Sequence, residues 1–254
     1  MESGNKIALV TGASRGLGKN MALNLAKQGA DIIAVYKNNE SDARVAVTEI
    51  EALGRQAIAL QLDTSDTKSF TTFFNKLSEN LQTKWGRDNF DFLINNAGIG
   101  IHSTFADTTE DSFDELMNVH FKGVYFLTQK ALPYIADGGR IINLSTGLTR
   151  FATPGYAAYA SMKGAVETLT KYLAKELGHR GITVNLVAPG IIHTDFTKGA
   201  FEHQPQLEDA MNSITALGRV GRPQDIGGIV AFLCSEEAGW ITAQRIEASG
   251  GMFL

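Results

Sequence analysis

Residues 7–18 decide the fold, and they read IALVTGASRGLG. The first four, Ile7–Val10, form the short apolar and β-branched run that is typical of a buried parallel strand. A helical pattern begins at Gly16, so a glycine-rich loop joins a strand to a helix. Such a loop lets the backbone approach a diphosphate, whose charge is stabilised by N–H groups at the positive end of the helix. The stretch therefore predicts a phosphate-binding loop, and the alternative is a glycine-rich turn without a ligand.

Two common phosphate-loop patterns do not fit this loop. The Walker A pattern requires Gly where Ala13 stands and Ser or Thr where Asn20 stands. The pattern G-x-G-x-x-G fails because Met21 occupies the position of its third glycine. The loop keeps only the spacing G-x3-G-x-G, and this spacing alone does not identify the ligand.

Outward from this loop, apolar runs alternate with amphipathic stretches along the whole chain. Strands are predicted at Ile7–Val10, Ile32–Val35, Ala57–Gln61, Phe90–Ile94, Arg140–Leu144, Ile182–Val187 and Arg245–Ala248. Helices are predicted at residues 16–28, 40–53, 67–81, 112–135, 156–177 and 223–234. Because strand–helix–strand units at this spacing build a parallel sheet covered on both faces, we expect a Rossmann-type, doubly wound α/β fold with seven strands. We expect a single domain over residues 1–254, a surface loop at 82–89 and a substrate lid at about 191–221.

Composition and charge exclude several classes of protein. The chain has 254 residues, of which 44% are hydrophobic and 20% charged, and a formal net charge of −4. These values are ordinary for a globular protein, and the net charge gives no reason to expect a nucleic-acid or membrane partner. Cys234 is the only cysteine, which favours a reducing compartment, and the first residues lack the apolar segment of a signal peptide. We therefore expect a cytoplasmic protein.

Tyr159 and Lys163 are the strongest candidates for catalysis. They lie four residues apart on a predicted helix, so their side chains share one face. The alternative is a solvated helix face, but the pair follows a predicted strand at the edge of the sheet where such folds bind ligands. A neighbouring ammonium group is expected to lower the pKa of the phenol, which could then exchange a proton with a carbonyl or an alcohol.

Four short motifs, in this order, resemble those of the short-chain dehydrogenase/reductase family. They are Thr11-Gly12-x3-Gly16-x-Gly18, Asn95-Asn96-Ala97-Gly98, Tyr159-x3-Lys163 and Pro189-Gly190. The resemblance covers essentially the whole chain, including Gly250-Gly251 near the end, and is greatest to the 3-oxoacyl-[acyl-carrier-protein] reductase-like members. It implies hydride transfer between a nicotinamide dinucleotide and a carbonyl or alcohol.

The resemblance also implies which residues form the site. The catalytic residues would be Tyr159, Lys163, Asn118 and one hydroxyl, from either Ser145 or Thr146. The family spacing of thirteen residues before the tyrosine falls on Thr146, and Ser145 stays open as the alternative. Asn118 resembles the asparagine that holds a water in a proton relay. The cofactor would contact Gly12, Ser14, Arg15, Gly16, Leu17, Gly18, Tyr36, Lys37, Asp63, Asn95, Ala97, Gly98, Tyr159, Lys163, Pro189, Gly190, Ile192 and Thr194.

Some of these cofactor contacts have specific expected roles. Asp63 would accept a hydrogen bond from the adenine amino group, and Asn95 and Gly98 would lie along a ribose. Residues 189–194 would hold the nicotinamide carboxamide. Asn96 is expected to tie strands together rather than to bind the cofactor.

The end of the second predicted strand indicates NADP(H) rather than NAD(H). In dinucleotide folds an acidic residue there binds the ribose 2′-hydroxyl and repels a 2′-phosphate. Here Tyr36 stands at that position, Lys37 follows it, and Arg15 in the glycine loop offers a planar fork of donors. Glu40 and Asp42 begin the next helix and are discounted as ribose ligands. The alternative is that both cations are simply exposed.

The sequence thus predicts NADPH-dependent reduction of a ketone or 3-oxoacyl-type carbonyl, or the reverse oxidation. The alternatives are an NAD-dependent alcohol or sugar dehydrogenase and a non-catalytic dinucleotide-binding regulator, which would not need Tyr159 and Lys163. The expected pocket walls favour an apolar or bulky carbonyl compound. These walls comprise Ile99, Ile101, Leu148, Phe151, Phe196 and Phe201. No cluster of Arg and Lys on the expected lid points to an acyl-carrier protein, so a free small-molecule ketone stands beside a carrier-bound acyl group as the expected substrate.

Histidines and apolar helix faces complete the expectations. No H-E-x-x-H pattern or Cys/His cluster predicts a metal site. The five histidines are expected to be solvated or packed, although His102 and His193 flank the expected pocket. The helices at 112–135 and 156–177 carry apolar residues on more than one side, which favours a second partner besides the sheet. The resemblance implies helices paired in dimers or tetramers, and we expect a homo-tetramer. The apolar end, Met252–Leu254, is expected at an interface.

Overall fold

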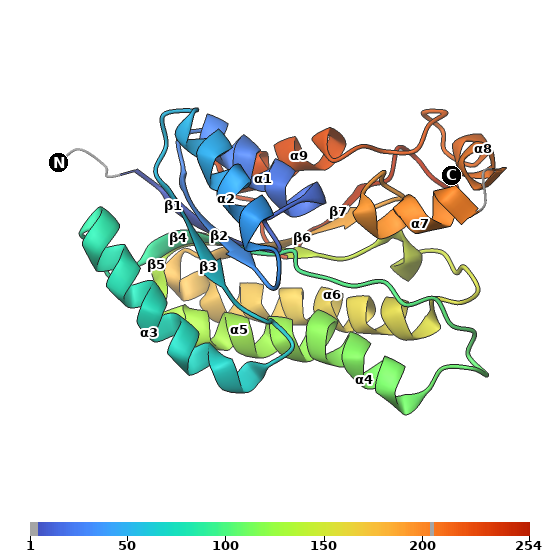
Figure 1. The fold of residues 1–254 in the computed structure, drawn as a ribbon, viewed down its shortest axis with the longest axis horizontal. Helices are drawn as coiled ribbons and strands as arrows, with labels where there is room; N and C mark the ends of the chain where they lie inside the picture. The colour runs from blue at the N-terminus through green and yellow to red at the C-terminus, as the bar shows by residue number, and fades with distance from the viewer. Residues whose placement is uncertain (1–4, 204–205) are drawn as a thin grey trace.

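A computed structural model describes residues 5–203 and 206–254 of the chain. Its described part contains one parallel sheet with the strand order β3-β2-β1-β4-β5-β6-β7 (Figure 1). The strands are β1 (Ile7–Thr11), β2 (Asp31–Tyr36), β3 (Ala57–Gln61), β4 (Phe90–Asn95), β5 (Ile135–Leu144), β6 (Thr183–Pro189) and β7 (Arg245–Ala248). The predicted seven-stranded Rossmann-type sheet is confirmed. The strand order reverses direction between β1 and β4, which is where doubly wound folds bind ligands beyond the carboxyl ends of the strands.

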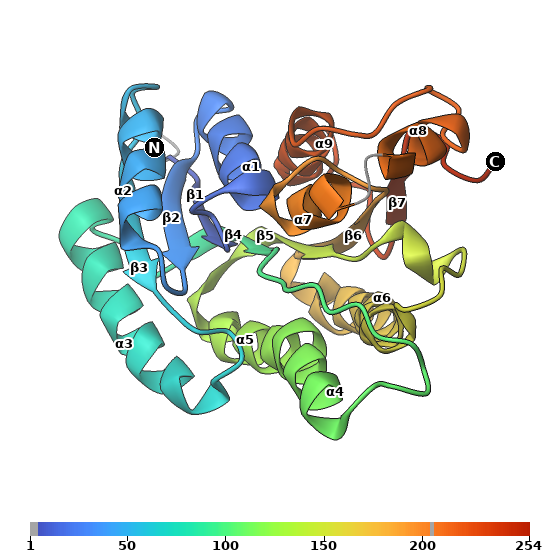
Figure 2. The same cartoon turned by 45° about the vertical axis from the view of Figure 1, so that its right-hand side comes forward.

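Helices cover both faces of the sheet (Figure 2). One face carries α1 (Gly16–Lys27), α2 (Glu40–Glu51) and α9 (Gln224–Cys234); the other carries α3 (Phe70–Asn80), α4 (Glu110–Met117), α5 (Gly123–Ala131) and α6 (Ala157–Leu177). Successive residues of β1 alternate between the two cores: Ala8 packs with the first set of helices and Leu9 with the second. Because both faces are covered, every residue of β1 and β2 is buried, and most of these residues are apolar.

The helix predicted at 112–135 is divided in the structure. Between α4 and α5 lies a π-helical turn, Asn118–Lys122, and a 3-10 turn, Leu132–Tyr134, precedes β5. Strand β5 therefore begins at Ile135, within the segment predicted as helix. A π-helical turn holds one more residue per turn than an α-helix and is frequent at functional sites.

Two predicted irregular segments are more ordered than expected. The prediction of a surface loop at 82–89 was wrong for the first part of that segment, because Leu81–Trp85 forms a π-helical turn that ends at Gly86. Leu81 is buried, and the Trp85 indole donates a hydrogen bond to Asp31, so the turn is fixed to the core. The segment at 191–221 carries two helices, α7 (Asp195–His203) and α8 (Gln206–Ser213), which lie on the same side of the sheet as α1 and α9 (Figure 2). Among the described helices, none has the length and apolar character needed to cross a membrane.

Candidate active site

Lys163 is buried beside the end of β5. Its ammonium group donates a hydrogen bond of 2.7 Å to the carbonyl oxygen of Leu144, the last residue of that strand. The same nitrogen lies 5.8 Å from the centre of the Tyr159 ring. Only 4% of Lys163 is exposed, and this burial lowers its pKa to about 8. Helix α6 thus brings the two predicted catalytic residues together at the edge of the sheet.

Tyr159 keeps its proton more tightly than an exposed tyrosine. Burial raises the pKa of Tyr159, and a hydrogen bond between the Tyr159 and Thr146 hydroxyls acts in the opposite direction without outweighing it. The net direction is opposite to the lowering expected from Lys163, because burial disfavours the phenolate. A tyrosine in this state is a proton donor at neutral pH, as the reduction of a carbonyl requires.

The two candidate hydroxyls have different surroundings. The Ser145 hydroxyl donates a hydrogen bond of 2.8 Å to the carboxylate of Glu167. The Thr146 hydroxyl shares its hydrogen bond with Tyr159 and also accepts one from the Leu148 amide. Successive residues at a strand end point to opposite sides, so only one of the pair can face the phenol. The geometry therefore favours Thr146 as the hydroxyl that would bind the carbonyl oxygen of a substrate beside Tyr159.

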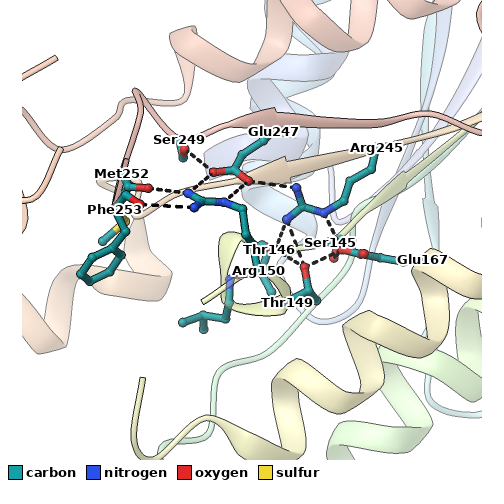
Figure 3. A network of polar contacts seen from close by, with 11 residues as sticks. Ser145, Thr146, Thr149, Arg150, Glu167, Arg245, Glu247, Ser249, Met252 and Phe253 are labelled. Carbon is teal, nitrogen blue, oxygen red and sulfur yellow. Dashed lines mark hydrogen bonds and ion pairs between the residues drawn. The ribbon is translucent and has the colours of Figure 1, made fainter. Parts of the chain in front are cut away.

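Glu167, on α6, holds the loop that follows β5 (Figure 3). Besides Ser145, its Oε1 accepts hydrogen bonds from the Thr149 hydroxyl at 2.6 Å and from Nε of Arg245 at 2.9 Å. Arg245 in turn donates to the backbone oxygen of Thr146 at 3.2 Å. One carboxylate and one guanidinium group thus hold both residues that carry the candidate hydroxyls, Ser145 and Thr146.

The same network continues to the C-terminal residues (Figure 3). Glu247 accepts from both Arg245 and Arg150, and the Arg150 bonds hold the pKa of Glu247 near 2. Arg150 also donates to the backbone oxygens of Met252 and Phe253. Sequence reasoning missed Arg150, Arg245 and Glu247, and it had no signal for them, because Arg245 lies 78 residues from Glu167 and Arg150 lies 97 residues from Glu247.

The glycine loop fits a diphosphate. Gly12 and Gly16 have φ angles of +67° and +54°, which favour glycine. A Cβ on Gly18 would lie 2.1 Å from the Gly12 oxygen, so the loop and the helix can approach this closely only without a side chain. Arg15 immediately precedes α1 and makes no side-chain cap, and the first turn of α1 carries no acidic residue. These features leave the amide groups at this helix end suited to a negatively charged ligand.

The two cations predicted for a 2′-phosphate both lie next to carboxylates. Arg15 pairs with Asp195 at 3.4 Å, and Lys37 pairs with Asp63 at 2.9 Å. The charged side chains of both pairs are substantially exposed. Tyr36 ends β2, as expected, and is largely buried.

The acidic residues at the start of α2 are engaged locally. Glu40 pairs with Arg44 one turn later, and Asp42 accepts a hydrogen bond from Asn39. These local contacts agree with the expectation that Glu40 and Asp42 do not bind the ribose. Asp63 also accepts from the amide and the hydroxyl of Ser65.

The two asparagines after β4 have separate tasks. Asn96 donates from its side chain to the Thr11 backbone oxygen at 2.8 Å, so its predicted role of tying strands together is confirmed. Asn95 was expected along a ribose, but its buried side chain donates to Thr128 and Asn143 instead. The side chain of Asn95 therefore bonds within the sheet interior, and its expected contact with a ribose stays a prediction.

Asn118 and His120 come from the π-helical turn between α4 and α5. Asn118 begins the turn and is half-buried, and its expected part in a proton relay stays a prediction. His120 is buried, and its ring meets the Tyr159 ring edge-on, with ring centres 4.9 Å apart. The sequence indicated only that His120 would be solvated or packed, and its place beside Tyr159 was missed.

A pocket of about 440 Å³ lies between the glycine loop and α7. It is lined by Gly16, His193, Thr194, Asp195, Lys198, Phe201, Glu202 and Pro223. The pocket unites the predicted loop residue Gly16 with Thr194 and with His193, which was expected to flank a pocket. The imidazole of His193 packs on the Phe201 ring at 4.6 Å and forms a contact of 2.8 Å with Glu208.

The segment after β6 is held closely against its neighbours. Pro189 ends β6, and a Cβ on Gly190 would lie 2.9 Å from Ser249, so only glycine fits there without a shift. Ile192 is buried and forms a bridge with Gly221. This packing positions the segment predicted to hold the nicotinamide.

The expected pocket walls are partly engaged elsewhere. Phe151 packs on Phe253, with ring centres 4.6 Å apart. His102 meets the Tyr156 ring edge-on at 5.1 Å, just before α6. The side chain of Phe196 lies outside the part that the structure describes. Within the described residues, no group of His, Cys, Asp and Glu could hold a metal ion.

The fold and this site define a dinucleotide-dependent oxidoreductase, and comparison with known proteins agrees. The family model described as enoyl-(acyl carrier protein) reductase matches residues 12–253. The 3-oxoacyl-[acyl-carrier-protein] reductase FabG of Staphylococcus aureus is 37% identical over 251 residues, which are 98% of each chain.

Two solved structures are similar over nearly their full lengths. One is the promiscuous reductase LugOII, described as catalysing keto-reduction at C1 during lugdunomycin biosynthesis. It is 38% identical to this chain with a TM-score of 0.93, and the match covers 100% of both chains. The other is the angucycline C-6 ketoreductase LanV with bound NADP, also 38% identical with a TM-score of 0.93, covering 98% of this chain and 97% of LanV. This chain belongs to the short-chain dehydrogenase/reductase family. The predicted resemblance is thereby confirmed.

Proposed function

We propose that this chain is an NADPH-dependent reductase of a small-molecule ketone. The single observation that carries the proposal is the placement of Tyr159, which hydrogen-bonds to Thr146 and has the Lys163 ammonium group 5.8 Å from the centre of its ring. This group stands at the carboxyl edge of the sheet, beside a glycine loop that fits a diphosphate. The set provides what carbonyl reduction needs from a protein: a proton donor, a hydroxyl for the oxygen and a nearby cation.

The residues have complementary tasks in this reaction. When bound, the nicotinamide supplies the hydride to the carbonyl carbon. Thr146 donates a hydrogen bond that holds the carbonyl oxygen, and Tyr159 transfers its phenolic proton to that oxygen as negative charge develops on it. The product is an alcohol and the Tyr159 phenolate, which the Lys163 ammonium stabilises until a proton from solvent restores the phenol. The reverse sequence oxidises the alcohol.

The choice of NADPH rests on charge at the end of β2. No carboxylate occupies the position of Tyr36, and two exposed cations, Lys37 and Arg15, lie at the ends of β2 and of the glycine loop. A 2′-phosphate can compete for both, since exposed ion pairs are weak. The NADP bound to LanV supports this assignment. An NAD-dependent alcohol or sugar dehydrogenase is the alternative that the assay must separate.

The experiment is a substrate panel with both cofactors. The purified chain is mixed with β-keto esters, 3-oxoacyl thioesters, polycyclic aromatic ketones and simple sugars, and the loss of NADPH or NADH absorbance is followed. We expect ketone reduction with a higher kcat/KM for NADPH than for NADH. We expect Tyr36→Asp together with Lys37→Ala to reverse that preference. A wild-type preference for NADH, or no change in the double variant, would contradict the cofactor assignment.

We also propose that the chain is a single cytoplasmic domain in which residues 191–221 form the substrate lid.

We further propose that the chain assembles as a homo-tetramer. Exposed aromatic side chains on α4, α5 and α6 support an interface, namely Phe113, Tyr125, Phe126 and Tyr172. Val166 is an apolar residue of α6 as well, but it is buried within the chain and is not part of this exposed face. Met252 is also buried in its own chain, so of the apolar end only Phe253 and Leu254 remain exposed. Light scattering that gives a stable monomer at micromolar concentration would contradict the assembly.

A further inference from the structure

His120 contacts two parts of the active site with one imidazole ring. Its Nε2 lies 2.7 Å from the backbone oxygen of Ile99, in the loop after β4, and only 1% of the residue is exposed. Its ring meets the Tyr159 ring at an angle of 87°, the edge-to-face arrangement that aromatic rings prefer. The imidazole therefore connects a loop at the edge of the site with the ring of the proton donor.

The hydrogen bonds indicate which nitrogen of His120 carries the proton. Nε2 is 2.7 Å from the Ile99 oxygen and 3.2 Å from the Ile99 amide nitrogen, and these two contacts require opposite tautomers. The shorter contact favours Nε2–H as the donor to the oxygen. Nδ1 then carries a lone pair, and it is buried with no hydrogen-bond partner within the described part of the chain.

A positive charge on this ring is strongly disfavoured. Burial, together with the nearby charge of Lys163, lowers the pKa of His120 to about 3. The groups that face the imidazole are Lys163 and Tyr159 from α6 and the backbone of Gly98 and Ile99 from the loop after β4. His120 therefore stays neutral throughout the pH range in which Tyr159 would work. The positively charged group beside Tyr159 is then Lys163.

The backbone around His120 is adapted to this ring. His120 lies in the π-helical turn, and a Cβ on Gly98 would lie 2.8 Å from the imidazole Cε1. The close approach of Gly98 to the ring thus depends on the absence of a side chain. This contact gives Gly98 a structural task in addition to its expected place along the cofactor.

We propose that His120 is a positioning residue for proton transfer, which fixes the plane of the Tyr159 ring and the path of the Ile99 loop. The inference rests on the proposed role of Tyr159 as proton donor. The ring edge limits rotation of the phenol, and the bond to Ile99 holds the neighbouring wall of the site. Small errors in the position of a reacting group are costly, so both contacts should affect turnover.

Two variants separate the two contacts. His120→Phe keeps a ring against Tyr159 but cannot bond to Ile99, whereas His120→Gln keeps an N–H donor but loses the ring. We expect His120→Gln to lower kcat by about tenfold with KM nearly unchanged, and His120→Phe to raise the ketone KM by about fivefold with a smaller loss of kcat. His120→Ala should show both effects. NADPH affinity and melting temperature are measured for each variant, so that the rates refer to folded, cofactor-binding protein.

Two kinetic outcomes and one NMR outcome would overturn the positioning role of His120. If the apparent kcat of both variants falls only in proportion to their loss of folded protein, with KM unchanged, His120 is only a packing residue. If both keep wild-type constants, it has no role in the reaction. An NMR titration of the imidazole nitrogens, which needs no substrate, should find a neutral ring with Nε2 protonated between about pH 5 and pH 8. Titration of His120 near its ordinary pKa would refute the positioning geometry, whereas an inactive wild type with a neutral His120 would refute only the proposed ketoreductase.

Discussion

The two flanks of the candidate active site hold their charges in different ways. On the flank formed by the β5–α6 loop, Glu167, Arg245, Glu247 and Arg150 form one continuous network, in which each charged group has at least two partners (Figure 3). On the flank formed by the glycine loop and β2, the cations form single, exposed pairs, Arg15 with Asp195 and Lys37 with Asp63.

This difference matches the two tasks of the site. Groups that stabilise developing charge work best when they are fixed in advance, because no reorganisation is then needed during the reaction. The network fixes the backbone of Thr146 in this way. Exposed ion pairs contribute little to stability and are easily exchanged for another partner, such as a phosphate. We infer that the network flank serves the chemical step and that the exposed flank selects the cofactor.

The largest effect should come from removing the proton donor between these flanks. We expect Tyr159→Phe to lower turnover by at least about 10²-fold, because positioned proton transfer contributes that much or more. NADPH binding, measured by fluorescence, should change little, since the glycine loop is untouched. Near-normal turnover in this variant would refute the proposed mechanism.

The two hydroxyls after β5 provide a matched pair of variants. We expect Thr146→Ala to lower kcat by about 10²-fold, because it removes the hydrogen-bond donor beside Tyr159. Ser145→Ala should lower kcat only a few-fold, since its hydroxyl bonds to Glu167 and the other partners of Glu167 remain. Steady-state kinetics of both variants with the same ketone tests this order. The reverse order would assign the catalytic hydroxyl to Ser145.

This pair also shows how far the sequence could lead. The strand-and-helix pattern predicted the order of the elements, and the spacing of Tyr159 and Lys163 predicted their shared face. Spacing could not decide between Ser145 and Thr146, and it could not show that the Asn95 side chain bonds within the sheet interior. Adjacent residues on a strand point to opposite faces, so an error of one residue exchanges a core side chain for a site side chain.

Other parts of the site had no signal in the sequence. The partners of Glu167 include Arg245, which is 78 residues away, and a single sequence does not reveal such a pair. The π-helical turn that carries His120 was hidden within an amphipathic pattern that predicted one continuous helix. The burial that raises the pKa of Tyr159 likewise depends on packing between distant segments. These are tertiary effects, which local propensity does not contain.

The charge of Lys163 should give the reduction a pH dependence. Burial lowers the pKa of Lys163 to about 8, so its ammonium form is lost as the pH rises through that value. Without the cation the Tyr159 phenolate is less stable, and kcat for reduction should fall by about tenfold between pH 7 and pH 9. Tyr159 itself stays protonated over this range, because its pKa is raised. A kcat at saturating NADPH that stays constant over this range would contradict the role of Lys163.

The network flank can be weakened without touching a reacting group. Arg245→Met removes the guanidinium group that bonds to Glu167 and to the Thr146 backbone, and keeps a side chain of similar length. We expect kcat to fall by about fivefold with the NADPH KM unchanged, because the loop that carries Thr146 becomes less fixed. Lys130→Met, an exposed change on α5, is the matched control for loss of a cation. An unchanged kcat in Arg245→Met would mean that the network serves stability alone.

The smallest expected effect lies on the exposed flank. Asp195 is the partner of Arg15, so Asp195→Asn should free the guanidinium group for a 2′-phosphate. We expect the NADPH KM to fall by about threefold and the NADH KM to stay constant, because NADH offers no phosphate at that position. In an Arg15→Ala background the same substitution should have no effect, which a double-mutant cycle measures. If Asp195→Asn changes both cofactors equally, or still acts without Arg15, the pair influences the position of α7 rather than the choice of cofactor.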